Sequence, residues 1–342
     1  MSRRTKKVLN APTKASRKVE RARIGRLSQL VVQPKTKQRY EEAFSSFCKF
    51  HHLSRGFQLP QFHTFDEWVA DCVEQLWETG ASKSEASYTL AAIQFFRPQA
   101  KNNLAWSWKL VKTWNQIELP TRATPFSAEI LLSLAGQAFK WNQYRMGWLL
   151  VLDFSGFLRT SELLLLERKE VILPADGRPQ EAVLLLSSTK GTKKNLLPLD
   201  KVVLQEKLAI RALTELCVGL QPGDTLSQQS SHQFRRLFQD LLEALHLQQQ
   251  GYMPYSLRRG GVTSAYRLGI PLDVLVTQGR WQHMPTARLY IDAGLQSLAQ
   301  LALPPKALAK CALMRQYFRT VSQRGRVERS WCDRSLWAAP FL

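Results

Sequence analysis

The sequence lacks long apolar runs and is poor in acidic residues. No apolar stretch reaches the roughly 20 residues that a membrane-spanning helix needs, and no signal segment with a charged start and an apolar core opens the chain. Only 27 Asp and Glu oppose 48 Lys and Arg, which leaves a formal charge of +21. Such a charge repels itself unless it meets a polyanion, so nucleic acid is the expected partner and an anionic membrane surface the alternative.

Cysteine and histidine are also scarce, and neither forms a metal-binding pattern. The cysteines are Cys48, Cys72, Cys217, Cys311 and Cys332, an odd and scattered set without a C-x-x-C pair. This usage favours reduced thiols inside a cell and argues against a zinc site. The six histidines lack acidic or cysteine partners at ligand spacing, so we interpret them as packing or surface residues and expect no metal.

The basic residues are concentrated at the start of the chain. Residues 1–33 carry many lysines and arginines, and Glu20 is their single acid. Such a run is typical of a nucleic-acid-binding arm or a nuclear import signal, although an acid-poor transit peptide is an alternative. We therefore expect an intracellular protein, in the nucleus of a eukaryote or in the cytoplasm and nucleoid otherwise.

Residues 34–117 have the apolar periodicity of a helical module. Four stripes recur at helical spacing, the last of them through Trp106, Val111, Trp114 and Ile117. We interpret the tryptophans as core residues, with base stacking as the alternative. The segment ELPTRATP, Glu118 to Pro125, contains two prolines and no apolar period, so residues 118–125 are the expected linker and domain boundary.

Residues 126–304 predict a second, mixed domain. Ser127 is expected to cap a helix that has Glu129 in its first turn. Further helices are expected at 201–219, 231–248, 258–268 and 272–279. A three-stranded antiparallel meander is expected at Lys169–Leu173, Ala182–Ser187 and Asn195–Leu199. Residues 305–342 form a basic tail with apolar positions at Leu313, Tyr317, Phe318 and Val321.

Several cations occupy positions where an anion could be held. Arg159, in SGFLRTSELLLL, follows a strongly apolar helix and needs an anionic partner. That partner could be a bound anion, and the alternative is a structural salt bridge to Glu162. Lys190, in STKGTKKNLLPL, is expected at a hairpin tip, and its alternative is a solvated turn lysine. YSLRRGG places Arg258 and Arg259 at a helix start, where free N–H groups favour phosphate.

Together these segments resemble the tyrosine recombinase (phage integrase) family, of the mobile-element type. The resemblance rests on GFLRTSEL, KGTKKNLLPL, YSLRRGG and GRWQHMPTARLY, in this order and with the family's interval from Trp281 to Tyr290. It implies a mainly α fold with a small antiparallel β-sheet. It also implies two domains, a helical core-binding domain of the SAM-like type at 34–117 and a catalytic domain at 126–304.

The resemblance also implies roles for the site residues. Arg159 and Arg258 would bind the phosphate, since guanidinium groups suit the charged transition state of phosphoryl transfer. Lys190, or Lys193 in its place, would protonate the leaving oxygen, and Trp281 would pack against the site and donate its indole N–H. Tyr290 would be the nucleophile. His283 is interpreted as a surface residue.

Tyr255 departs from the family pattern, which has histidine at this position. A tyrosine hydroxyl can donate a hydrogen bond, but it is a poor base at neutral pH. The sequence therefore leaves three functions open. The first is a site-specific recombinase that cleaves and rejoins DNA through a 3′-phosphotyrosine, independent of metal, ATP or other cofactors. The alternatives are a DNA-binding protein that has lost turnover and a type IB topoisomerase-like enzyme.

The resemblance finally implies an assembly on double-stranded DNA. The free protein is expected to be a monomer that forms a homo-tetramer on DNA. Residues 305–322 have an apolar stripe that could pack in trans on a neighbouring protomer, and packing in cis on their own domain is the alternative.

Overall fold

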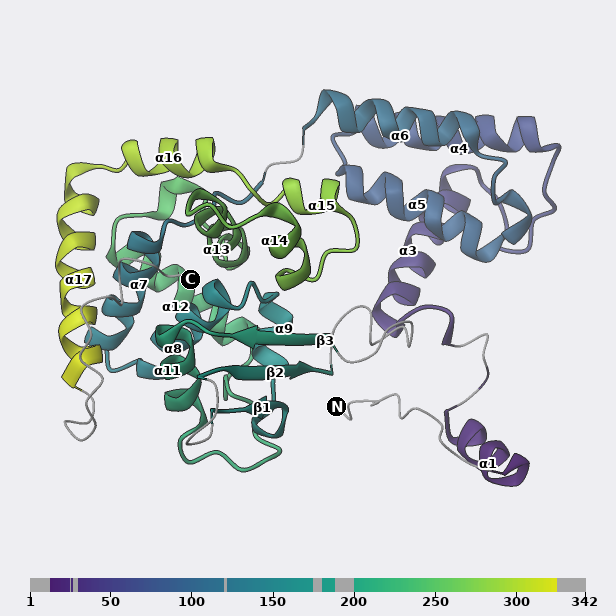
Figure 1. Cartoon of the computed structure of the whole chain (residues 1–342). Helices are drawn as coiled ribbons and strands as arrows, with labels where there is room; N and C mark the ends of the chain where they lie inside the picture. The colour runs from purple at the N-terminus through teal and green to yellow at the C-terminus, as the bar shows by residue number, and fades with distance from the viewer. Residues whose placement is uncertain are drawn as a thin grey trace. The chain divides into compact units, whose positions relative to one another are not determined.

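The chain divides into two compact units. The computed structural model describes residues 13–24, 26, 30–119, 122–174, 180–187 and 200–324. The division into Met1–Thr121 (unit 1) and Arg122–Leu342 (unit 2) falls inside the segment that the sequence marks as a linker. The described part is mostly helical, with one three-stranded antiparallel sheet, so the expected fold class is confirmed (Figure 1). Among the described residues, no helix has both the length and the apolarity needed to cross a membrane.

Unit 1 is entirely helical where it is described. Its elements are α1 (Lys14–Ile24), α3 (Pro34–Phe50), α4 (Phe62–Glu78), α5 (Lys83–Phe96), a 3-10 turn (Pro98–Ala100) and α6 (Ala105–Ile117). A separate hydrophobic core joins α3 to α6, with Phe47, Phe65 and Ile93 fully buried. Asp66 of α4 caps α6, because its carboxylate accepts the backbone N–H groups of Trp106 and Ser107 at 2.8 and 3.0 Å.

The tryptophans of α6 do not all belong to this core. Trp114 is buried, but Trp106 and Trp108 are 50% and 40% exposed. Lys109 lies 5.1 Å from the centre of the Trp106 ring. The interpretation of these residues as core is therefore correct for Trp114 and wrong for Trp106 and Trp108, because α6 contacts its neighbours through one face only.

Unit 2 combines the sheet with a bundle of helices. Its first elements are α7 (Ala128–Lys140), α8 (Tyr144–Ser155), α9 (Thr160–Leu165), a 3-10 turn (Arg168–Glu170), β1 (Val171–Ile172), β2 (Ala182–Leu186), β3 (Asp200–Leu204) and α11 (Lys207–Cys217). They are followed by α12 (Ser231–Ala244), a 3-10 turn (Gln248–Gln250), α13 (Tyr255–Arg267), α14 (Leu272–Gln278), α15 (Met284–Arg288), α16 (Ala293–Leu301) and α17 (Pro305–Arg324).

The helix α8 is the centre of unit 2. All its residues from Met146 to Phe154 are buried, and it packs against α7, α11 and α13. A helix that is apolar on all sides needs such enclosure. The helix α7 begins as predicted, because the Ser127 hydroxyl accepts the N–H of Ile130 and Glu129 occupies the first turn.

The sheet has the order β1-β2-β3, and it lies to one side of the helices (Figure 1). Leu184 of β2 pairs with Val171 of β1 and Val202 of β3. The third strand is Asp200–Leu204, so the start of the helix predicted at 201–219 is wrong: these residues form backbone pairs with β2, and α11 begins only at Lys207. The strand predicted at 195–199 lies outside the described residues.

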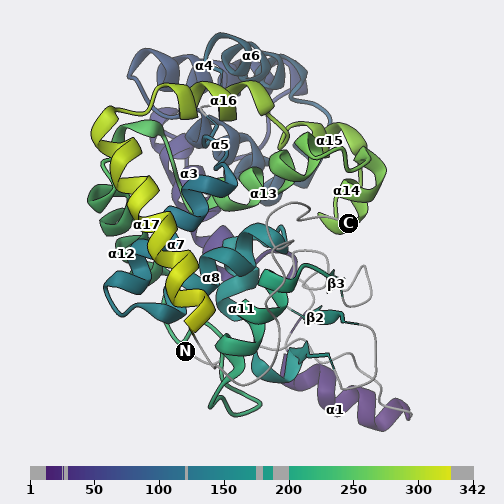
Figure 2. The same ribbon diagram turned by 60° about the vertical axis from the view of Figure 1, so that its left-hand side comes forward.

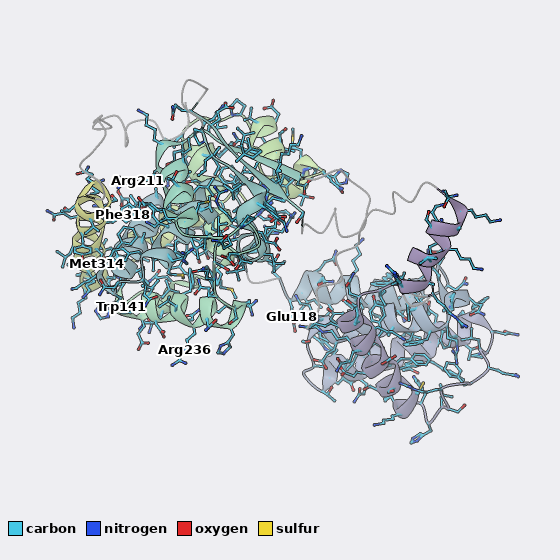
Figure 3. All side chains as sticks on the ribbon, turned by 90° about the horizontal axis from the view of Figure 1, so that it is seen from below. Glu118, Trp141, Arg211, Arg236, Met314 and Phe318 are labelled. Carbon is cyan, nitrogen blue, oxygen red and sulfur yellow. The ribbon has the colours of Figure 1, made fainter. Side chains whose placement is uncertain are left out.

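The C-terminal helix α17 packs against α7 of its own chain (Figures 1 and 2). Met314 and Phe318 are buried on this face (Figure 3), and the Phe318 ring lies 5.1 Å from that of Phe139. A Cβ on Gly136 would clash with the Met314 carbonyl, so glycine allows the close approach of the two helices. Exchange of residues 305–322 between protomers stays a prediction, and it would require α17 to leave α7.

Candidate active site

The double glycine of YSLRRGG allows two segments to approach α13. A Cβ on Gly260 would meet the backbone of Phe126 at 2.5 to 2.7 Å, and one on Gly261 would meet the Phe154 carbonyl oxygen. The first contact brings the chain's entry into unit 2 against α13, and the second brings in the end of α8. As a result, Arg258 and Arg259 are placed between these segments and the loop that carries Tyr290.

Arg258 is almost completely buried, with 1% of its surface exposed. Its guanidinium donates hydrogen bonds to the carbonyl oxygens of Phe157 and, at 2.6 Å, of Gly279. The rings of Trp281 and Tyr290 cover it, with centres 4.8 and 5.5 Å from Cζ. Burial lowers the pKa of Arg258 to about 10, and the charges of Arg280 and Arg159 add to this shift, so the group remains cationic at neutral pH.

Arg159 stands at the N-terminal end of α9 and forms an ion pair with Glu162. Its Nη1 lies 2.5 Å from the Glu162 carboxylate, whose other oxygen accepts the Arg159 backbone N–H at 2.9 Å. This is the structural partner that the sequence offers as an alternative to phosphate. With 27% of the Arg159 side chain still exposed, the ion pair does not close this residue off from solvent.

Glu162 and Arg280 are two site residues for which the sequence predicted no functional role. Arg280 Nη2 lies 2.7 Å from the Glu162 carboxylate, so one buried acid bridges two arginines. Burial raises the pKa of Glu162, but the charge of Arg280 and the hydrogen bond and charge of Arg159 outweigh it and lower the pKa overall. Glu162, the acid of TSEL, was predicted only as a salt-bridge partner of Arg159. Its place next to that arginine is the sequence feature that could have indicated its part in the site.

Two residues in the left-handed region meet at this bridge. Phe157 has φ 45° and Arg280 has φ 58°, and neither is glycine. Arg258 and Arg280 both donate to the Phe157 carbonyl, Arg280 at 3.3 Å. Left-handed non-glycine residues cost roughly 1–3 kcal/mol each and persist only where the surroundings fix them. The hydrogen bonds from Arg258 and Arg280 to the Phe157 carbonyl hold the backbone at Phe157 in this conformation.

Tyr290, Tyr255 and Trp281 form an aromatic cluster beside Arg258. The Tyr290 ring centre lies 4.7 Å from that of Trp281 and 5.6 Å from that of Tyr255. Tyr290 follows α15 and is half-buried, whereas Tyr255 opens α13 and is 40% exposed. Gly279 makes room for the Trp281 ring, because a Cβ there would overlap it.

The two phenols differ in acidity. Burial raises the pKa of Tyr290, but the nearby Tyr255 hydroxyl and Trp281 indole and the charges of Arg258 and Arg159 outweigh it and lower the pKa overall. Burial and the role of hydrogen-bond donor to Tyr290 raise the pKa of Tyr255. The Trp281 indole does not reach the geometry of a regular hydrogen bond with any described residue. Its effect on Tyr290 is therefore that of a nearby dipole. Tyr290 is the more acidic phenol of the pair.

A second acid, Asp153, lies in the core next to these arginines. It is fully buried on α8, and neither carboxylate oxygen has a hydrogen-bond partner among the described residues. Burial raises its pKa well above the ordinary value, although the Arg258 charge opposes this shift. Burial therefore favours the neutral form of Asp153, and we assign this residue no chemical role.

The remaining predicted residues divide as follows. Lys190 and Lys193 lie outside the described residues, in the segment that connects the adjacent strands β2 and β3. His283 is exposed at the start of α15. Within the described part of the chain, no group of three or more His, Cys, Asp or Glu residues could hold a metal ion. The structure thus brings together Arg159, Arg258, Trp281, Tyr290 and Tyr255.

Comparison with known proteins identifies the fold. No protein-family model and no curated protein sequence matches the chain. Among solved structures, the Tn1549 transposon integrase in complex with circular intermediate DNA has a TM-score of 0.54 at 14% identity, over 80% of this chain and 95% of that chain. A lambda integrase dimer bound to a COC′ core site also has a TM-score of 0.54 at 14% identity, over 81% and 94%. The chain therefore has the two-domain fold of the tyrosine recombinases.

Proposed function

We propose that the protein is a site-specific DNA recombinase that cleaves and rejoins DNA through a 3′-phosphotyrosine on Tyr290, without metal or ATP. The observation that carries the proposal is the Tyr290 phenol, which has a lowered pKa and lies beside the buried cation Arg258. A tyrosine that only filled a core would need neither feature. The fold shared with the tyrosine recombinases supports the same reading.

The proposed cleavage is a displacement at phosphorus. The Tyr290 phenol loses its proton to solvent, and its oxygen attacks phosphorus as the bond between phosphorus and the 5′ oxygen breaks. Lys190 gives the leaving 5′ oxygen a proton. Arg159 and Arg258 stabilise the negative charge that develops on the non-bridging oxygens. The new ester conserves the energy of the broken bond, so the 5′ hydroxyl of a second strand can reverse the step without ATP.

Tyr255 takes the place of the histidine that the family pattern has at this position. Its hydroxyl donates a hydrogen bond towards Tyr290 and so favours the phenolate, which is the attacking form. It does not act as a base, because its own pKa is raised. In this scheme Trp281 packs against the nucleophile and presents its indole N–H near the phosphate.

Phosphate entry requires a rearrangement of the aromatic cluster. Arg258 is 1% exposed and lies beneath the rings of Trp281 and Tyr290. Its terminal nitrogens each carry a second N–H beyond the one given to a carbonyl, and these can bind phosphate once the Tyr290 ring moves off the guanidinium. The same movement would bring the phenol into line with the leaving oxygen.

Duplex DNA is the proposed substrate. A formal charge of +21 fits a polyanion, and the lambda and Tn1549 integrases of similar fold are both solved with DNA. We propose that unit 1 is a core-binding domain, that unit 2 is the catalytic domain and that four protomers assemble on DNA. A mobile element as the source belongs to the same proposal.

A second function is favoured by specific observations. Tyr255 replaces the expected histidine, and the closed state of Arg258 leaves no open phosphate site. Both would suit a DNA-binding protein of the same fold that no longer turns over. This protein would bind duplex DNA but leave its backbone intact.

A nicked suicide substrate separates the two functions. Cleavage near a nick releases a short fragment, so the covalent protein–DNA adduct cannot be reversed and accumulates. Random duplexes that carry a nick, followed by sequencing of the DNA attached to the protein, remove the need to know the site. The proposed recombinase gives an adduct whose DNA-linked peptide contains Tyr290. An adduct on Tyr255 contradicts the assignment of the nucleophile. Duplex binding with no adduct at any site supports the non-catalytic protein.

A further inference from the structure

The segment that carries Tyr290 is held on α13 by polar contacts. Thr263 donates to the Tyr290 carbonyl at 3.2 Å and accepts the Asp292 N–H at 3.2 Å. One turn earlier on the same face, Arg259 Nη2 lies 3.5 Å from the Leu289 carbonyl oxygen and 3.5 Å from the Asp292 carboxylate. Backbone or side-chain groups before, at and after the nucleophile are therefore all bound to α13.

Arg259 also holds the start of unit 2. Its Nη1 donates to the carbonyl of Ala123, in the entry segment, which we define as residues 123–126. The same segment is bound to α16, because the Gln296 amide donates to the Phe126 carbonyl at 2.5 Å. The entry segment and the nucleophile segment thus share one buried guanidinium.

Burial keeps water from replacing these contacts, two of which are 3.5 Å long. Arg259 is 2% exposed, and its only carboxylate partner among the described residues is Asp292. A buried cation is costly unless ionic and hydrogen-bonding partners satisfy it, so the partners are drawn to the guanidinium from three directions. Asp292 is fixed in turn, because its other carboxylate oxygen caps α16 by accepting the Leu295 N–H at 3.0 Å.

We propose that Arg259 is a positioning residue for Tyr290, fixing the backbone on both sides of the phenol relative to the entry segment at Ala123. It does not touch the reacting atoms, since Arg258 and not Arg259 lies beneath the Tyr290 ring. A displacement of the entry segment would therefore be passed to the nucleophile through one side chain. The expected effect on cleavage rests on the proposed function, whereas the positioning of the Tyr290 backbone does not.

The test has a first arm that needs no DNA. Hydrogen exchange of the peptide that covers residues 289–292 is measured in the free full-length protein and in Arg259→Gln. The matched control is Arg145→Gln, because Arg145 also bonds two carbonyls of unit 2, those of Leu216 and Leu226. We expect exchange at 289–292 to rise about tenfold or more in Arg259→Gln and to stay unchanged in Arg145→Gln. Equal exchange in both variants overturns the inference.

The second arm uses the suicide substrate at saturating DNA. Arg259→Gln should bind duplex DNA as the wild type does, while the rate constant for adduct formation falls about 100-fold, as expected when a reacting group is misplaced by about 1 Å. Arg259→Lys keeps the charge towards Asp292 but cannot reach all three partners. Its rate constant for adduct formation should therefore lie between those of the wild type and Arg259→Gln. It also provides the measurement if Arg259→Gln does not fold.

The two arms separate failure of the inference from failure of the proposed function. If the wild type forms no adduct, the recombinase proposal fails, while the exchange data still decide whether Arg259 holds the Tyr290 segment. If the wild type forms adduct and Arg259→Gln and Arg259→Lys both form it at the wild-type rate, the positioning role is wrong and the function stands.

Discussion

The C-terminal part of unit 2 is attached to the rest by two different kinds of interface. The helix α17 lies on α7 through buried apolar side chains such as Phe318 and Met314, with Gly136 allowing close approach. The segment from Leu289 to α16 packs Tyr290 and Ile291 against the apolar cluster that includes Val262 of α13, and polar groups bind it to α13 as well. Gln296, which is 2% exposed, bonds Phe126, Ser264 and Arg267, whereas Leu298 and Leu301 of α16 are 64% and 84% exposed.

The difference separates stability from positioning. Apolar burial is strong but non-directional, and at α17 it is accompanied by one buried hydrogen bond, from the Ser133 hydroxyl to the Cys311 carbonyl. Hydrogen bonds are weaker in net terms but depend on geometry, so they can fix the backbone around Tyr290. We expect changes on the apolar side to lower the free energy of unfolding, and changes on the polar side to alter the chemistry first.

Tyr290→Phe should have the largest effect on cleavage and should leave the stability of the fold unchanged. The ring and its contacts with Trp281 and Arg258 remain, while the attacking oxygen is lost. Adduct formation on the suicide substrate should disappear, and duplex binding and the thermal unfolding midpoint should stay at wild-type values. Residual adduct would show that another residue attacks, and Tyr255→Phe is the control that identifies it.

Phe318→Ala should give the largest loss of stability. Phe318 is fully buried against Phe139 and Trp148, and removal of such a ring costs about 3–5 kcal/mol. Leu313→Ala on the exposed side of the same helix should cost at most about 0.5 kcal/mol. Urea unfolding measures both. Similar values for the two variants would mean that α17 does not pack on α7.

Gln296→Leu tests whether the polar interface can be replaced by an apolar one. The leucine has a similar size but leaves the Phe126 carbonyl and the Arg267 guanidinium without the partner they now have. Of these two groups the Phe126 carbonyl is buried and Arg267 is exposed. An unpaired buried group costs about 1–3 kcal/mol, so the free energy of unfolding should fall by that amount. Leu298→Gln, on the exposed face, is the control. A gain in stability in Gln296→Leu would contradict the polar attachment.

Tyr255→Phe should shift the pH profile of cleavage. The Tyr255 hydroxyl helps to lower the pKa of Tyr290, so its removal raises that pKa and leaves less phenolate at a given pH. The alkaline rise of the single-turnover rate should therefore move to higher pH, with about tenfold in rate for each unit of displacement. Tyr255→His, which restores a hydrogen-bond donor, should keep or raise the wild-type rate. An unchanged profile in Tyr255→Phe would remove Tyr255 from the mechanism.

Asp153→Asn should have the smallest effect, visible as a change in pH dependence. The pKa of Asp153 is raised in the folded state, so the folded protein holds a proton that the unfolded chain releases above about pH 4. Its contribution to stability therefore falls as pH rises from there towards the folded pKa. The variant lacks this loss and should gain stability relative to the wild type between pH 5 and pH 8. If the two proteins differ in free energy of unfolding by the same amount at pH 5 and at pH 8, Asp153 is ionised in the folded state.

Much of the fold could be predicted because it depends on local patterns. The helix at Ala128–Lys140 begins where Ser127 and Glu129 predict it, and the helices near 231–248, 258–268 and 272–279 follow apolar stripes. The start of the helix predicted at 201–219 was wrong. Residues 201–204 were predicted as the first turn of that helix, yet the alternate burial of Val202 and Leu204 belongs to a strand paired with β2.

The sequence by itself determined the fold class and the order of Arg159, Arg258, Trp281 and Tyr290 along the chain, because residue types and spacing survive without coordinates. Only the tertiary structure decided the environment of each group. It placed one buried acid between Arg159 and Arg280, closed Arg258 beneath two rings, and set a second phenol beside Tyr290. The physical reason is that pKa values and hydrogen bonds depend on burial and on partners distant in sequence, which residue spacing does not encode.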